Sequence, residues 1–139
     1  MFVYLRRAQY HETDKMGIVH HSNYVKWMEE ARIAFLAAIG LPYEAVEAQG
    51  IMSPVTGLTV EYRSPTTFGD EVAIAVSVAR YTGVQLELRY EMRQTRDDVV
   101  VATASSGHCF LREGRIVPLK KAEPAMHALL QAAADSDAD

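Results

Sequence analysis

The chain has 139 residues, 49% of them hydrophobic, which fits one globular domain with its own core. Aspartate and glutamate outnumber lysine and arginine by 18 to 14 and the basic residues are scattered, which argues against nucleic-acid binding. No apolar run is long enough to span a membrane and the first residues lack the pattern of a secretory signal, so we expect a soluble, cytoplasmic protein without membrane insertion.

The first predicted elements are a strand over residues 3–10 and a polar loop over 11–17, because weak alternation gives way to polar residues. From residue 22 the period changes, and apolar residues recur at steps of three and four. This spacing places them on one face of a helix over 22–39: Tyr24, Trp27, Met28, Ala31, Ala34, Phe35 and Ala38.

Both ends of this helix carry recognisable boundary residues. Ser22 or Asn23 can accept a backbone hydrogen bond at its start, and Gly40 followed by Pro42 ends it. The segment 33–39 has no charged residue on any face, so we expect protein to surround the second half of the helix.

After a short predicted helix over 42–48, alternation of apolar residues predicts four strands, over 56–63, 70–80, 85–93 and 99–111. Strand 70–80 has branched residues on one face and small residues on the other, which fits a strand covered on both sides. Strand 85–93 alternates strictly with charged residues, so only one of its faces should meet a core.

The end of the chain is predicted to hold a short strand around Ile116, a helix over 122–134 and a solvated acidic tail over 135–139. This order of elements indicates an α+β fold, an antiparallel sheet of five to six strands wrapped around one long central helix. We assign 1–121 to that domain and 122–139 to a C-terminal helix and tail. Cys109, the single cysteine, falls in a strand and is interpreted as a buried structural thiol.

Asp14 has the clearest chemical potential, because it lies in a loop eight residues before the predicted helix start at Ser22. Helix starts concentrate positive partial charge and unpaired N–H groups, which favour an ionised carboxylate and can bind an oxyanion. A carboxylate and such donors together suffice for hydrolysis of an activated ester. Alternatively, 14–17 is an ordinary turn in which Asp14 bonds its own backbone and Gly17 supplies a positive φ.

Other polar residues carry weaker signals. His20 and His21 follow the loop and are interpreted as polar loop residues or as substrate contacts. The remaining histidines are too isolated to predict a metal site. Ser105, Ser106 and His108 lie in a strand pattern, where neighbouring side chains point to opposite faces, and are assigned a structural role.

Residues 10–24, read as a unit, resemble the 4-hydroxybenzoyl-CoA thioesterase family, and in particular its branch of short-chain acyl-CoA thioesterases encoded near Tol-Pal components. The matching motif is an aspartate, a glycine, two aliphatic residues, a small residue and an Asn-Tyr pair: Asp14, Gly17, Ile18, Val19, Ser22, Asn23 and Tyr24. The similarity continues through 60–65 and Gly69-Asp70, and covers residues 3–120.

This resemblance implies a hotdog fold and an enzyme that hydrolyses short-chain aliphatic or aromatic acyl-CoA. It implies Asp14 as nucleophile or general base, and the backbone N–H of His21 as the donor that polarises the thioester carbonyl. By the same resemblance, the substrate-binding residues are Gly17, Val19, His20, Ser22, Asn23 and Tyr24. The resemblance also implies a homo-oligomer, a dimer or tetramer with shared active sites, and no cofactor beyond the CoA of the substrate.

Two other functions stay open at this stage. A hotdog enoyl-CoA hydratase also uses an aspartate with a histidine a few residues later, as Asp14 and His20 are spaced, but the Asn-Pro of that family is absent between them. A non-catalytic acyl-CoA-binding dimer would keep the fold without needing Asp14.

Overall fold

Alternating apolar residues build the central sheet of the protein, whose computed structural model describes residues 2–138. Five antiparallel strands lie in the order β1-β3-β4-β5-β2. Their bounds are β1 Phe2–Arg7, β2 Val55–Tyr62, β3 Glu71–Tyr81, β4 Gln85–Gln94 and β5 Val99–Cys109. A small hairpin follows, made of β6 (Leu111–Arg112) and β7 (Arg115–Ile116).

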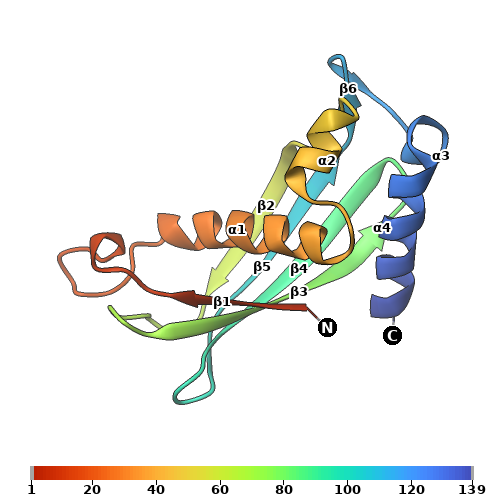
Figure 1. Ribbon diagram of the computed structural model, residues 1–139. Coiled ribbons are helices and arrows are strands. Elements are labelled where there is room, and N and C mark those ends of the chain that lie inside the picture. The colour runs from red at the N-terminus through yellow and green to blue at the C-terminus, as the bar shows by residue number, and fades with distance from the viewer. Residues whose placement is uncertain (1, 139) are drawn as a thin grey trace.

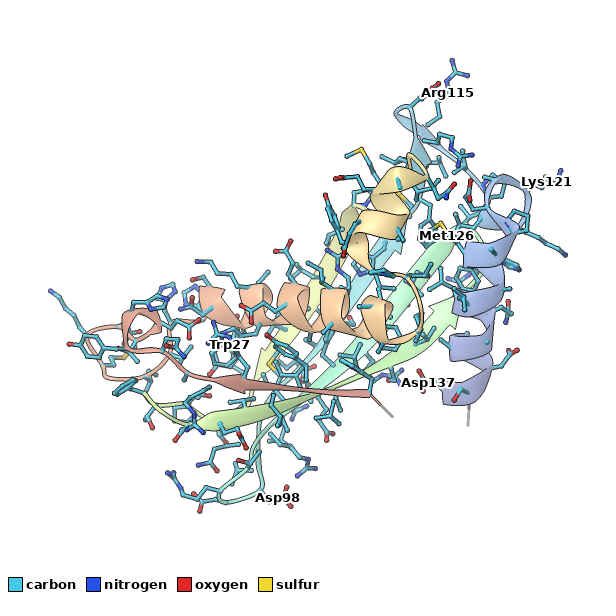
Figure 2. All side chains as sticks on the ribbon, viewed as in Figure 1. Trp27, Asp98, Arg115, Lys121, Met126 and Asp137 are labelled. Carbon is cyan, nitrogen blue, oxygen red and sulfur yellow. The ribbon has the colours of Figure 1, made fainter. Side chains whose placement is uncertain are left out.

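The long helix α1 (Ser22–Ala38) lies across one face of this sheet (Figure 1). One side of α1 is buried in the core, with the apolar residues Tyr24, Trp27, Met28, Ala31 and Phe35, and Trp27 is 0% exposed. Trp27 projects from α1 toward β1 (Figure 2), and its ring lies under the Arg6 guanidinium of that strand. The α+β arrangement predicted from the sequence, with one helix against an antiparallel sheet, is therefore confirmed.

The predicted alternation of strand 85–93 is also confirmed, since inward residues of β4 are buried and outward residues are exposed. Strand β3 follows its prediction in part, because Val72, Ile74 and Val76 are buried, whereas small residues of the other face such as Ala73 and Ala75 are half-buried. Small side chains leave little apolar surface to cover, so that face needs no partner element. Cys109 is buried, as expected.

Three further helices complete the chain: α2 (Tyr43–Ala48), α3 (Leu119–Ala122) and α4 (Pro124–Asp137). Met126 and Leu130 of α4 belong to the same core as the sheet and α1. The prediction of a solvated acidic tail was wrong for Asp137, whose Oδ2 accepts a hydrogen bond of 2.8 Å from the Val78 N–H. A register shift between Val78 and Arg80 in the β3–β4 pairing lies next to that N–H. The last turn of α4 therefore supplies a hydrogen-bond acceptor to an irregular part of the sheet (Figure 2).

The second half of α1 is not fully surrounded, contrary to expectation. Ile33 is 42% exposed, although Phe35 on the opposite side is buried. Ile33 and Leu36 form one wall of a groove of about 510 Å³, and α2 and the segment 50–54 form the other wall. The absence of charged residues from segment 33–39 therefore reflects an apolar surface along a groove, and not a helix that is buried on all sides. Within residues 2–138, no helix has the length and hydropathy that crossing a membrane requires.

Candidate active site

The loop between β1 and α1 folds as a tight hairpin. A 3-10 turn, η1 (Tyr10–Glu12), leads into it, and Thr13 then pairs with Val19 across the two limbs. The Asp14 N–H donates to the Ile18 carbonyl at 2.9 Å, and the Gly17 N–H donates back to the Asp14 carbonyl at 3.0 Å. Gly17 has φ +79° and open space where a Cβ would lie, so this turn needs glycine for its backbone angle rather than for room.

Asp14 sits at the tip of this hairpin and is half-buried. Its Oδ1 accepts a hydrogen bond of 2.8 Å from the Met16 N–H, which is the side chain-to-backbone bond of an ordinary Asx turn. No residue from 2 to 138 donates to the other carboxylate oxygen, Oδ2. The turn interpretation and the catalytic prediction are thus compatible, because one oxygen fixes the side chain and the second is free to react.

The start of α1 forms the other limb of the site. His21 already has helical angles, φ −56° and ψ −29°, and no side chain caps the helix from that position. The prediction that Ser22 or Asn23 caps the helix was wrong. Instead, Nδ1 of His20 accepts the Ser22 N–H at 3.2 Å and lies 2.8 Å from the Ser22 hydroxyl, because the preceding histidine ring reaches over the first turn.

The His21 N–H, the predicted oxyanion donor, has no acceptor in the described part of the chain. The His21 carbonyl, in contrast, accepts a hydrogen bond of 3.0 Å from the Tyr62 hydroxyl of β2. The His21 ring is exposed and lies against the ring of His20, with centroids 4.1 Å apart. The helix start therefore offers a free donor whose peptide is anchored on its other side.

A buried carboxylate, Glu12, holds this loop to the core. Glu12 is 3% exposed, and its two oxygens accept hydrogen bonds from both terminal nitrogens of Arg6, from Trp27 Nε1 at 2.9 Å and from the Gln9 N–H at 2.8 Å. Burial raises the pKa of Glu12, but the bonds from Trp27, Gln9 and Arg6 outweigh it, so the pKa of this carboxyl lies below its usual value. Glu12 therefore stays ionised inside the protein.

The polar side chains of two motif residues, Asn23 and Tyr24, bind neighbouring parts of the protein. The Asn23 side-chain amide donates to the Glu12 carbonyl at 2.9 Å, and the Tyr24 hydroxyl donates to Thr66 Oγ1 at 2.9 Å. Val19 is 4% exposed, and its N–H donates to the Thr66 carbonyl. In the structure these residues fix the hairpin and the helix start relative to each other, and their predicted contact with substrate stays a prediction.

Comparison with known proteins places this geometry in a family. The model of the Thioesterase-like superfamily matches residues 8–132. The chain belongs to this superfamily. YneP of Bacillus subtilis, provisionally named an acyl-CoA thioesterase, is 30% identical over 127 residues, which cover 91% of this chain and 92% of YneP. The acyl-CoA thioester hydrolase YbgC of Escherichia coli O157:H7 is 31% identical over 80 residues, 58% of this chain and 60% of YbgC.

Among solved structures, the DHNA-CoA thioesterase from Staphylococcus aureus matches with a TM-score of 0.89 at 29% identity, over 94% of this chain and 88% of that one. The superfamily match and this likeness confirm the predicted hotdog fold. They assign no role to individual residues of the thioesterase-like chain, so Asp14 and His21 stay predicted catalytic groups.

Sequence reasoning missed the residues that support this thioesterase-like site, above all Glu12, Arg6 and Tyr62. One signal was available, because Gln9 and Glu12 have the spacing of a capping box, and the Glu12 carboxylate accepts the Gln9 N–H at 2.8 Å. A second signal was the single tryptophan, since a buried indole N–H normally needs an acceptor. Tyr62 had no local signal, because its partner His21 is distant in sequence.

Proposed function

We propose that this protein hydrolyses acyl-CoA thioesters to the free acid and CoA, with Asp14 and the His21 N–H as its working groups. The observation that carries the proposal is that, within residues 2–138, Asp14 Oδ2 at the tip of the hairpin and the His21 N–H at the start of α1 have no protein partner. Membership of the Thioesterase-like superfamily and the names of YneP and YbgC support the same reaction.

The chemistry requires one attacking group and one charge-stabilising group. Ionised Asp14 either attacks the thioester carbonyl carbon or removes a proton from the attacking water. The His21 N–H, at the positive end of the α1 dipole, stabilises the negative charge that develops on the carbonyl oxygen. The exposed ring of His21 and the side chains of His20 and Ser22 border this position.

The substrate class within this reaction is a short-chain aliphatic or aromatic acyl-CoA. The aromatic option is supported by the likeness to a DHNA-CoA thioesterase, and the short-chain option by the resemblance of the motif to the Tol-Pal-associated branch of the 4-hydroxybenzoyl-CoA thioesterases. The proposed enzyme works in the cytoplasm and needs no cofactor beyond the CoA of its substrate.

The proposed assembly is a homo-oligomer that pairs through β2. This strand is at one edge of the sheet and almost all of its residues are exposed. It presents apolar side chains that include Leu58 at 45% and Tyr62 at 51% exposure. A long, apolar, unpaired edge is a template for pairing with another strand, and pairing at β2 places a second subunit beside Tyr62 and the start of α1.

The substitution Asp14→Asn tests the proposal sharply, because an asparagine oxygen keeps the turn bond to the Met16 N–H while the reactive charge is lost. We expect unchanged folding and a fall in kcat for thiol release of at least ~100-fold. The matched control is Asp98→Asn in the exposed β4–β5 turn, where φ +54° suits asparagine equally well.

Thiol release at the wild-type rate in Asp14→Asn would contradict the assignment. A wild-type protein that hydrates crotonyl-CoA without releasing CoA would identify a hydratase, and one that binds acyl-CoA without turnover would identify a binding protein.

A further inference from the structure

A second feature of the inner face is a crevice between α1 and the β2 edge that the reaction above does not use. It encloses about 100 Å³. Its walls are mostly apolar and its floor is polar, with the lining Val25, Met28, Glu29, Arg32, Val55, Leu58, Tyr90, Ser106 and His108. The crevice adjoins the proposed active site, because Val25 lies one helical turn after His21, and Tyr62 of β2 is bonded to His21.

The floor of the crevice is a chain of three buried polar side chains. The Tyr90 hydroxyl lies 2.7 Å from Ser106 Oγ, and Ser106 Oγ lies 2.7 Å from His108 Nε2. The three residues are 1%, 4% and 1% exposed. Ser106 and His108 share the inner face because they are two residues apart in β5, whereas Ser105 points outward and meets Thr59 Oγ1 at 2.6 Å.

The hydrogen-bonded row of Tyr90, Ser106 and His108 has more donor protons than hydrogen bonds. Burial, with the nearby Arg32 charge, lowers the pKa of His108 to about 4, so the imidazole is neutral near pH 7 and carries one N–H. Tyr90, Ser106 and His108 then supply three donor protons, but the chain contains two hydrogen bonds. One donor is therefore left over for every tautomer and hydroxyl orientation.

The hydrogen-bonded row ends at Nδ1 of His108. Within residues 2–138, Nδ1 of His108 makes no hydrogen bond although it is buried. The Pro54 carbonyl lies near enough to oppose the fall in the pKa of His108, but not in a geometry that makes a bond. A buried donor or acceptor without a full partner costs about 1–3 kcal/mol, so a polar group that enters the crevice gains the unused hydrogen-bonding capacity of Tyr90, Ser106 and His108.

We propose that the crevice receives the far end of the acyl group, and that Tyr90, Ser106 and His108 bind a hydroxyl or carbonyl oxygen carried there. The inference rests on the proposed thioesterase function and names a substrate class for it, acyl groups oxygenated remotely from the thioester. A hydroxyl suits the chain in either direction because it both donates and accepts.

The position of the crevice sets the distance of this oxygen from the reacting carbonyl. The α1 residues of its lining lie between Val25 and Arg32, roughly 6 to 16 Å beyond His21 along the helix axis. Val25, Met28 and Leu58 provide apolar contact for the intervening carbons. Of the two charged residues in the lining, Glu29 and Arg32, Arg32 lies near enough to the floor to oppose the rise in the pKa of Tyr90 and to help lower the pKa of His108.

Matched substrates test this proposal on the full-length wild-type protein. Thiol release is measured for hexanoyl-, octanoyl- and decanoyl-CoA and for their ω-hydroxy counterparts. We expect kcat/KM to be about tenfold higher for the hydroxylated member at one chain length, which corresponds to one buried hydrogen bond gained.

The decisive variant replaces the three hydrogen-bonded side chains of the floor by apolar ones, Tyr90→Phe, Ser106→Ala and His108→Phe together. Removing all partners at once leaves no orphaned polar group, so this variant should fold. We expect it to hydrolyse octanoyl-CoA and to lose the preference for the hydroxylated substrate. The control is Ser105→Ala, on the same strand but the outer face, which should keep the preference.

Each of four outcomes overturns the inference. Equal kcat/KM within every pair means that water alone satisfies the spare donor, and a preference that survives in the triple variant means that the hydroxyl binds elsewhere. If the triple variant does not fold, the single variants Tyr90→Phe and His108→Phe decide, since at least one must lower the preference. Absence of thiol release from any substrate refutes the proposed thioesterase function as well, whereas equal turnover within each pair refutes only the inference.

Discussion

Replacing Glu12 by glutamine should destabilise the protein strongly, although the two side chains have the same shape. An amide offers one acceptor oxygen, and in either orientation its NH₂ group faces one terminal nitrogen of Arg6 together with a second donor, the Gln9 N–H at the Oε1 position or Trp27 Nε1 at the Oε2 position. Breaking a buried ion pair by removing one partner costs about 3–5 kcal/mol. Arg6 keeps its bond of 2.8 Å to Glu30, so the lower part of the range applies.

We therefore expect Glu12→Gln to lower the free energy of unfolding by about 3 kcal/mol, and the melting temperature by roughly 9–12 °C. Urea denaturation followed by circular dichroism measures the first quantity, and calorimetry the second. The control is Glu91→Gln, whose carboxylate also pairs with an arginine at 2.9 Å but on the exposed outer face. It should unfold like wild type.

A Glu12→Gln protein as stable as Glu91→Gln would refute the argument that the buried carboxylate anchors the loop. The pH dependence gives an independent check on the same residue. Because its pKa is lowered in the folded state, the stabilisation by Glu12 is present above the unfolded-state pKa of about 4.3 and is lost as the pH falls below it. Glu12→Gln should lack this loss at acidic pH.

Two more predictions concern buried or anchored polar groups. The pKa of His108 is lowered from 6.5 to about 4, so as the pH falls the unfolded chain binds a proton before the folded protein does. The free energy of unfolding should therefore drop between pH 6.5 and 4, by roughly 3 kcal/mol in total. In His108→Phe the urea midpoint should change less across this pH window, and a pH dependence equal to that of wild type would contradict the assignment. Asp137→Ala should cost about 1–2 kcal/mol by orphaning the Val78 N–H, and Asp135→Ala, which loses only a surface bond to Gln131, should not; equal thermal melts of the two variants would contradict this.

Local periodicity was sufficient to predict the regular elements of this fold. The three- and four-residue spacing of apolar residues located α1 within a residue of its end, and strict alternation located β4 equally well. These patterns work because each helix or strand buries one face against the same core.

Features that depend on distant partners were out of reach. The carboxylate of Asp137 meets an N–H that lies far back in β3, and no local pattern connects the two. The cap from the His20 ring depends on the path of the hairpin, and side-chain preferences at helix starts favour serine and asparagine instead. At the candidate site, the motif predicted which residues gather, but not that Glu12 supports them.

The strand order has a consequence for how the molecule folds. Strands β3, β4 and β5 are consecutive neighbours joined by short turns, whereas β1 and β2 attach at the two edges after long excursions of the chain. Local pairings close with little loss of chain entropy, so the three-stranded meander is favoured as the early folding unit. The edge strands and the hairpin with Asp14 then join after the meander, because their pairings close longer stretches of chain.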